Sequence, residues 1–253
     1  MIKENKASKY LLYAIGEIVL VVIGILIALS INNWNETRKS DKQIDLLLKN
    51  LVQSIDEDLN YLNKTEILHE FRSNSLAYLL RISGHNLKQL SFVEPVPKHK
   101  NNTIWEGSYP DTLNMDFVNL TMIYSGIHDD VVVNKNVLDE LKNTGLYSAI
   151  KNDSLKKAIN NYYTFVNRNF LIEDWNEGLT TSWREFLRDK YGVLTMQLYF
   201  KDDPLSFVKL NESVRVRIHE MIGPARFRSG NASKAIDLAE DVITEINTYQ
   251  KSK

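Results

Sequence analysis

The chain has 253 residues, no cysteine and a formal net charge of −1 at pH 7. The lack of cysteine excludes disulfides, thiolate metal sites and thiol catalysis, and the nearly balanced charge, without a basic stripe, argues against nucleic-acid binding. With only 10 glycines and 5 prolines, long stretches are uninterrupted, which favours helices.

Residues 11–31 are almost entirely apolar, with Glu17 as the only formal charge. As a helix they would span about 30 Å, the thickness of the hydrocarbon core of a bilayer. A secretory signal peptide has a shorter apolar core and a small-x-small cleavage site, which is missing here. A soluble helix this apolar would need a partner on every side. We therefore predict a transmembrane helix over residues 11–31, after a short basic tail over residues 1–10.

Both ends of this segment carry residues typical of a membrane interface. Tyr10 and Tyr13 lie at one end and Trp34 at the other, and such rings are enriched at the boundary between lipid and water. Basic residues are about as frequent after the segment as before it, but short basic tails tend to stay in the cytoplasm. This predicts a single-pass protein of the cell inner membrane, with a cytoplasmic N-terminus and a periplasmic C-terminal domain.

Glu17 is the unusual residue of the predicted span, because a carboxylate near the bilayer centre costs about 2.5–3.5 kcal/mol even on the gentler insertion scale. Gly24 and Ala28 lie within about 20° of Glu17 around the helix. Small residues on one stripe are typical of close helix–helix contact in lipid. We predict that Glu17, Gly24 and Ala28 form a self-association or partner-helix face. Two alternatives stay open, namely a proton or ion relay and a carboxylate that reaches headgroups through local thinning.

A long helix that continues from the membrane is predicted over residues 35–84, ending at Gly84. Apolar residues recur in it every three or four positions, until Glu66, His69 and Ser73 occupy the same phase. This polar gap indicates a kink or a hydrated, functional stretch of the bundle core. The alternative, which we favour, is that the buried stripe drifts onto three neighbouring apolar residues, Ile67, Leu68 and Phe71.

Residues 85–110 contain three prolines and no sustained period, which predicts an irregular connection. Residues 111–253 are predicted to form the remainder of the helical bundle. The first elements expected there are a helix from Asp111, a short helix closing at Gly145 and a long helix from Asn152 to Lys190. Residues 193–200 have strand character. A break is expected at Gly223-Pro224, before a helical hairpin that turns at Gly230-Asn231.

Aromatic residues recur at helical spacing in the predicted long helix, among them Tyr162, Trp175 and Trp183. Such rings can line a ligand pocket between helices, and these three are the candidates for one. A stripe at this spacing is more often bundle core, which is the interpretation we favour.

Histidine-based chemistry is the remaining enzymatic hypothesis, with His69, His128 or His219 in a hydrolase or metal site. None of them has a partner at catalytic spacing in the sequence. The run His128-Asp129-Asp130 fits a solvated turn better than a metal site, because three adjacent residues do not converge on one ion. We therefore predict no catalytic, cofactor-binding or metal-ligating residue.

Four stretches resemble a known family. Residues 8–18 (SKYLLYAIGEI), 22–29 (VIGILIAL) and 31–36 (INNWNE) are similar to the opening of an uncharacterised family of bacterial membrane proteins common in the Bacteroidota, a domain of unknown function. Residues 138–163 are similar to the middle of that family. The leader is shorter and less basic than is usual there. The resemblance implies a cell-membrane protein without an assigned activity.

The sequence thus predicts an all-α fold, in which one N-terminal transmembrane helix continues into a long-helix bundle. The protein is expected to be non-enzymatic, without a cofactor, and to associate with the lipid bilayer and with itself or another membrane protein. The alternative is an extracytoplasmic small-molecule sensor with an aromatic-lined pocket.

Overall fold

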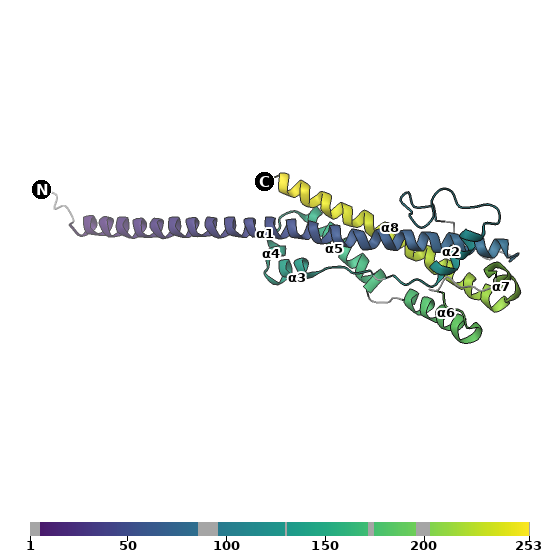
Figure 1. Ribbon diagram of the computed structural model, residues 1–253. Helices are drawn as coiled ribbons and strands as arrows, with labels where there is room; N and C mark the ends of the chain where they lie inside the picture. The colour runs from purple at the N-terminus through teal and green to yellow at the C-terminus, as the bar shows by residue number, and fades with distance from the viewer. Residues whose placement is uncertain (1–5, 86–95, 130, 172–174, 196–202, 253) are drawn as a thin grey trace.

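The computed structural model describes residues 6–85, 96–129, 131–171, 175–195 and 203–252 (Figure 1). All secondary structure in these ranges is helical, which confirms the predicted all-α class. The molecule is an elongated bundle from which one end of a long helix projects (Figure 1).

That helix is α1, which runs without interruption over Lys6–Ile82. Its first part is a bare rod, and its second part is the central helix of the bundle (Figure 1). As predicted, the helix ends next to Gly84, whose φ of +81° is a left-handed conformation that glycine adopts without a Cβ clash.

The second long helix is α8, Glu212–Lys251, which runs antiparallel to α1 and ends near the point where α1 leaves the bundle (Figure 1). Gln250 Nε2 donates to the carbonyl oxygen of Asp45 at 3.0 Å and ties this end of α8 to α1. The other elements pack around this pair: α2 (Met115–Ser125), α3 (Asn136–Asn143), α4 (Leu146–Ala149), α5 (Asp153–Val166), the π-helix η2 (Asn167–Leu171), α6 (Trp175–Tyr191) and α7 (Pro204–Leu210).

Two apolar clusters form the core. The basal cluster lies nearer the projecting rod and joins α1, α5 and α8 through buried residues such as Leu51, Ile159 and Val242. The distal cluster joins the end of α1 to α2, α6 and α7 and includes Phe117 and Trp183. Between the two clusters α1 carries buried polar residues, among them Thr65 and His69, which are described below.

A bare stretch of α1, residues 32–43, separates the apolar segment from the first buried core residue, Ile44. Its side chains are exposed apart from partial cover at Ser40. At 1.5 Å per residue it holds the bundle about 18 Å beyond the apolar segment.

Three predicted features of the C-terminal part differ in the structure. The helix expected over residues 152–190 is divided into α5 and α6, with the π-helix η2 after α5. The helix expected from Asp111 begins at Met115, because Asn114 Oδ1 accepts a hydrogen bond from the backbone N–H of Phe117 at 2.9 Å and caps it. Residues 193–195 form no strand, and the rest of that predicted strand lies outside the described residues.

The predicted break at Gly223-Pro224 and the hairpin after it are wrong, because α8 continues through both. An interior proline costs a helix about 3 kcal/mol. Met221, Ile222 and Ala225 on either side of it are buried, and their packing offsets that cost. Of the irregular connection predicted over residues 85–110, residues 96–110 contain no helix or strand, and residues 86–95 lie outside the described part.

Candidate functional site

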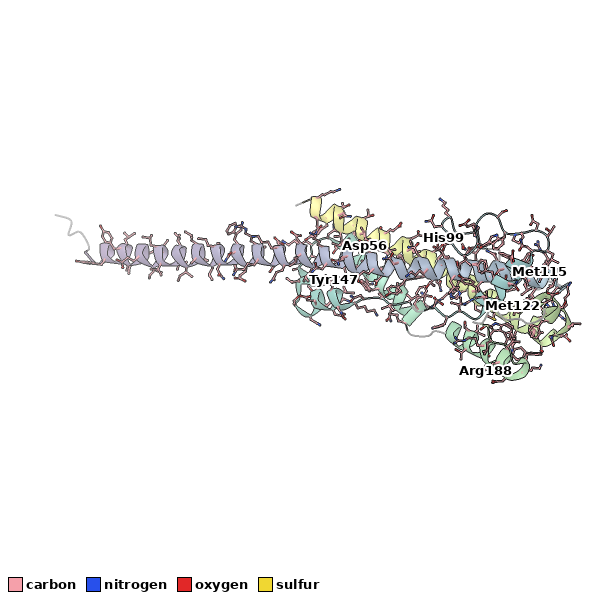
Figure 2. The ribbon with its side chains drawn as sticks, viewed as in Figure 1. Asp56, His99, Met115, Met122, Tyr147 and Arg188 are labelled. Atoms are coloured by element: carbon pink, nitrogen blue, oxygen red, sulfur yellow. The ribbon has the colours of Figure 1, made fainter. Side chains whose placement is uncertain are left out.

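The predicted membrane face lies on the projecting rod of α1. Glu17, Gly24 and Ala28 are all exposed, and a Cβ added at Gly24 would meet no atom within 4 Å. The predicted interfacial rings Tyr10 and Tyr13 are exposed as well. The side chains of this part of α1 project outward on all sides (Figure 2). The described residues of the bundle therefore leave this face open to an outside partner.

Trp34 marks the end of the apolar segment nearer the bundle. Its ring is exposed, and the guanidinium carbon of Arg38 lies 5.6 Å from the ring centroid. A cation over the face of an indole is a favourable contact, and both groups suit the headgroup level of a membrane.

The candidate pocket aromatics do not share one site. Tyr162 is buried in the basal cluster, where its hydroxyl donates to Asp58 Oδ2 at 2.9 Å. Trp183 is buried in the distal cluster, where its indole N–H donates to Ser125 Oγ at 2.8 Å. The side chain of Trp175 lies outside the described part of α6. The two described rings therefore have packing roles, which agrees with the bundle-core interpretation.

The polar gap of α1 forms a buried cluster around Asp129, which follows α2. His69 Nε2 lies 2.6 Å from Asp129 Oδ1, and Thr65 Oγ1 donates to Asp129 Oδ2 at 2.9 Å. Arg228 of α8 adds an ion pair at 3.4 Å from its Nη2 to Asp129 Oδ2. The solvated turn predicted at His128-Asp129-Asp130 is therefore wrong at Asp129, because partners from α1 and α8 enclose its carboxylate.

The surroundings of His69 fix its protonation. Burial, reinforced by the charge of Arg72, lowers the pKa of His69 to about 4, so the imidazole is neutral at pH 7. Burial alone would raise the pKa of Asp129, but the hydrogen bond and charge of His69 and the charge of Arg228 hold that pKa below its ordinary value. The neutral ring donates its Nε2–H to the Asp129 carboxylate.

Arg72 supports this arrangement from the same face of α1. Its Nη1 lies 3.5 Å from His69 Nδ1, which suits the tautomer with the proton on Nε2. Its Nε donates to the carbonyl oxygen of Tyr124 at 3.1 Å, and its Nη2 donates to that of Ile127. A cation that binds the last carbonyls of a helix is favourable, so Arg72 caps α2.

The polar gap shows no kink, because α1 is continuous through it, and it matches the favoured drift only in part. Leu68 and Phe71 are buried as the favoured drift predicts, but His69 and Ser73 are buried as well. The preference for the drift alone is wrong, because α1 is enclosed on every side at this level and its polar face meets polar partners. The His69 and Asp129 pair has the composition of a hydrolase dyad, but His69 is 0% exposed and offers no surface to a substrate.

A second buried carboxylate, Glu70, holds the irregular connection against α1. The hydroxyl of Tyr109 lies 2.8 and 2.9 Å from its two oxygens, and Asn102 Nδ2 donates to it at 2.6 Å. Asn74 Nδ2 donates to Glu70 Oε1 at 2.7 Å and to the carbonyl oxygen of Val96 at 2.8 Å. These bonds fix the position of residues 96–110.

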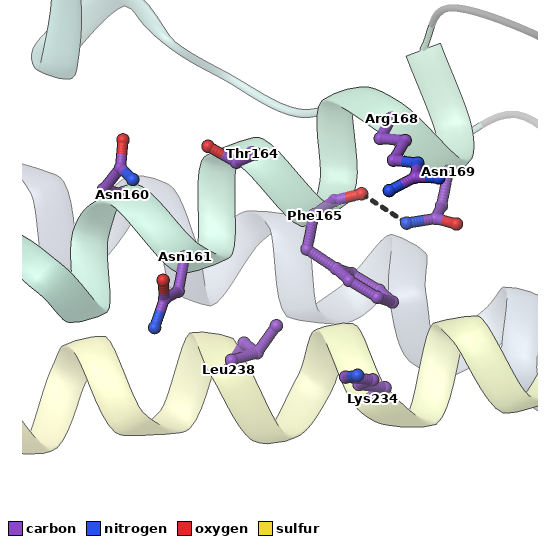
Figure 3. Close-up of a pocket in the computed structure, with 8 residues that line it drawn as sticks. All are labelled: Asn160, Asn161, Thr164, Phe165, Arg168, Asn169, Lys234 and Leu238. Carbon is purple, nitrogen blue, oxygen red and sulfur yellow. Dashed lines mark hydrogen bonds between the residues drawn. The ribbon is translucent and has the colours of Figure 1, made fainter.

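Open grooves lie along α8, and two of them border its middle part. One, with a volume of about 840 Å³, is formed by α1, residues 96–101 and α8, and contains the pair of His99 Nε2 and Glu66 Oε2 at 3.4 Å. His99 lies beside α1 in the irregular connection (Figure 2). Burial raises the pKa of Glu66, and the charge of His99 opposes that shift. The other groove, about 530 Å³, lies between α5 and α8 (Figure 3).

Among the described residues, no group of three or more His, Asp or Glu side chains could hold a metal ion. His219 of α8 lies beside His85, with the two ring centroids 5.7 Å apart. Sequence reasoning missed the Asp129 cluster. Its signal was the phase of Glu66, His69 and Ser73, which placed polar side chains at core positions.

Part of the chain matches the model of a known family. Residues 17–113 are similar to DUF6090, a family of unknown function. The match covers most of the apolar segment, the rest of α1 and the irregular connection with the Glu70 cluster, and it ends before α2. It supports the resemblance to a family of unknown function and adds no catalytic residue. No curated protein and no solved structure matches the chain.

Proposed function

We propose that the protein is a non-enzymatic, single-pass anchor of a helical bundle, which associates with itself or with another membrane protein through Glu17, Gly24 and Ala28. The family resemblance supports a bacterial cell-membrane protein. A non-enzymatic role is supported by the His69 and Asp129 pair, which is bonded within the core and enclosed by it.

The proposal depends on one observation: the apolar segment of α1 is uncovered, although the same helix continues as the centre of the bundle. Leu12 and Leu20 are 68% and 72% exposed, and no residue in the most apolar stretch of α1 is buried. Soluble proteins rarely leave an apolar surface of this size in water. The helix is long and apolar enough to cross a membrane, and lipid would provide the missing cover.

For the orientation, we infer a cytoplasmic N-terminus and a periplasmic bundle in the inner membrane, supported by the basic residues Lys3, Lys6 and Lys9. Alkaline phosphatase fused after Lys253 should be active, because that enzyme works only outside the cytoplasm. A green fluorescent protein fused at the same place should stay dark. The reverse pair of results would overturn this orientation.

Self-association can be tested with single thiols, because the chain contains no cysteine. Ala28→Cys places a thiol on the proposed face, and Leu26→Cys places one at a similar depth about 160° away around the helix. On mild oxidation in native membranes, Ala28→Cys should form a disulfide-linked dimer far more efficiently than Leu26→Cys. Equal yields at both positions would contradict a specific homotypic face.

A different membrane partner would be found by purification in mild detergent. Proteins that copurify with the wild type should be lost from Glu17→Leu and retained with Leu26→Ala, which alters the opposite face. If neither the oxidation yields nor the copurified proteins depend on the face, the proposed function is wrong.

A further inference from the structure

We propose that the groove between α5 and α8 binds a small organic anion, one that carries a phosphate or carboxylate next to an apolar group. This inference does not depend on the proposed association in the membrane, because the groove is formed by the bundle alone (Figure 3). Its lining differs from the aromatic pocket considered from the sequence.

The charge of the lining is the first argument. Arg168 comes from η2 and Lys234 from α8, and none of the described residues that line the groove is acidic. Asp237, one turn further along α8, lines the neighbouring groove instead. Two cations from different helices that face one space, with no carboxylate among the described lining residues, favour a negatively charged ligand.

The hydrogen-bonding groups are the second argument. Asn160, Asn161 and Thr164 add amide and hydroxyl groups along α5. The side chains of Arg168, Asn160 and Asn161 have no hydrogen-bond partner among the described residues, so their donors are available to a ligand. Arginine presents its donors as a fork that matches the oxygens of phosphate and carboxylate.

The local backbone is the third argument, because the groove is built where α5 changes into a π-helix. The π-helix η2 covers Asn167–Leu171 and therefore contains Arg168 and Asn169. Such turns are rare and occur frequently at functional sites. Asn169 is held on both sides. Its Nδ2 donates to the carbonyl oxygen of Phe165 at 2.8 Å (Figure 3), and its Oδ1 accepts from Asn231 Nδ2 at 3.3 Å.

The groove also offers an apolar surface. The half-buried ring of Phe165 lies between α5 and α8, with Leu238 next to it on α8 (Figure 3). Lys234 Nζ lies 5.2 Å from the centroid of that ring. A cation beside an aromatic ring suits a ligand whose anionic group meets Lys234 and Arg168 while its apolar part contacts Phe165.

The position of the groove indicates that the ligand is dissolved in water. Ser229 Oγ donates to the carbonyl oxygen of Glu66 at 3.3 Å, which places this part of α8 at the level of Glu66 on α1. Glu66 lies about 50 Å beyond Ile31 along the helix axis. Headgroups of the membrane that would hold α1 cannot reach so far, and a volume of about 530 Å³ suits a small molecule.

Calorimetric titration of the full chain in detergent micelles tests the proposal, with phenyl phosphate and benzoate as probes. At least one should bind saturably, and more tightly than inorganic phosphate or phenol. The double variant Arg168→Gln with Lys234→Gln should weaken binding at least tenfold, and Phe165→Leu should reduce the affinity for the aromatic anion toward that for inorganic phosphate. Lys49→Gln, which removes an exposed cation where α1 enters the bundle, should leave binding unchanged.

Absence of saturable binding by both aromatic anions would overturn the proposal, as would equal affinity in the wild type and the double variant. Equal affinity for inorganic and phenyl phosphate would overturn the role of Phe165. Arg168 and Lys234 are exposed, so glutamine should not unfold the bundle, and a melting curve of each variant checks this. A chain that binds the probes but fails both the oxidation test and the copurification test would refute the membrane face alone.

Discussion

Asp58 offers a sharp test of the electrostatics of the basal core. Its carboxylate is 2% exposed and accepts hydrogen bonds from the backbone N–H of Asn134 at 3.0 Å and from the Tyr162 hydroxyl at 2.9 Å. Burial outweighs these two bonds and raises the pKa of Asp58 from 3.8 to about 6. We predict that Asp58→Asn, which keeps the shape and removes the charge, stabilises the protein at neutral pH.

The magnitude follows from linkage. Between pH 4 and 6 the folded chain holds the Asp58 proton more tightly than the unfolded chain, so stability is lost as the pH rises through this range. At about 1.4 kcal/mol per pKa unit the loss at pH 7 is up to about 3 kcal/mol, and partial solvation reduces it to about 2. Asp58→Asn removes this loss. It should raise the melting temperature by about 4–8 °C at pH 7, and by almost nothing at pH 4.

His69 has the opposite dependence and makes the test sharper. Because its folded pKa of about 4 is below the ordinary value of 6.5, stability falls as the pH drops from 6.5 to 4. In the wild type this loss partly cancels the gain at Asp58. The Asp58→Asn variant should therefore lose stability on acidification more steeply than the wild type.

Thermal unfolding of the full chain in detergent, followed by circular dichroism from pH 4 to 7.5, measures both effects. The matched control is Asp56→Asn, which removes the same charge from an exposed position two residues earlier on α1 (Figure 2). Its melting temperature should stay close to that of the wild type at every pH. A lower melting temperature for Asp58→Asn at pH 7, or an advantage that does not shrink toward pH 4, would refute the reasoning.

Three further substitutions test other contacts by the same melting assay. Asp129→Ala should cost about 3–5 kcal/mol, because Arg228 is left in the core without its carboxylate, and an unchanged melting temperature would contradict the ion pair. Glu70→Ala should cost about 1–3 kcal/mol and expose residues 96–110 to trypsin, whereas an unchanged digestion pattern would show that other contacts hold them. Gly126→Ala would place a Cβ 2.6 Å from that of Thr195, so it should cost about 1–3 kcal/mol, and Thr195→Gly should recover part of that loss in the double variant.

The central helix was predictable because its signals are local. The apolar run over residues 11–31, the spacing of the apolar residues after it and the terminal Gly84 are all read within a few turns of one helix. Pro224 shows the limit of such signals, since a local rule predicts a break there and burial on both sides of it prevents one. Nothing in the apolar period of residues 152–190 distinguishes a π-helix from a continuing α-helix.

The buried polar cluster required information that one segment does not contain. Asp129 lies beside His128 in a short polar run, which is also the composition of a solvated turn. Its partners Thr65 and His69 precede it by 64 and 60 positions, and Arg228 follows it by 99. Only folding brings these groups together. The sequence does show that α1 places polar residues in its buried phase, which indicates that partners must exist without identifying them.

In the proposed membrane arrangement, the unbroken α1 also links the direction in which Glu17 points within the bilayer to the orientation of the whole bundle. One residue added within 32–43 would turn the acid by about 100° around the helix axis relative to His69, while lifting the bundle by only about 1.5 Å. A partner helix that binds Glu17 in lipid therefore also fixes the rotation of the bundle, and of every groove on it, about the axis of α1. A change in the length of this helix therefore alters the rotational orientation of the bundle far more than its distance from the membrane.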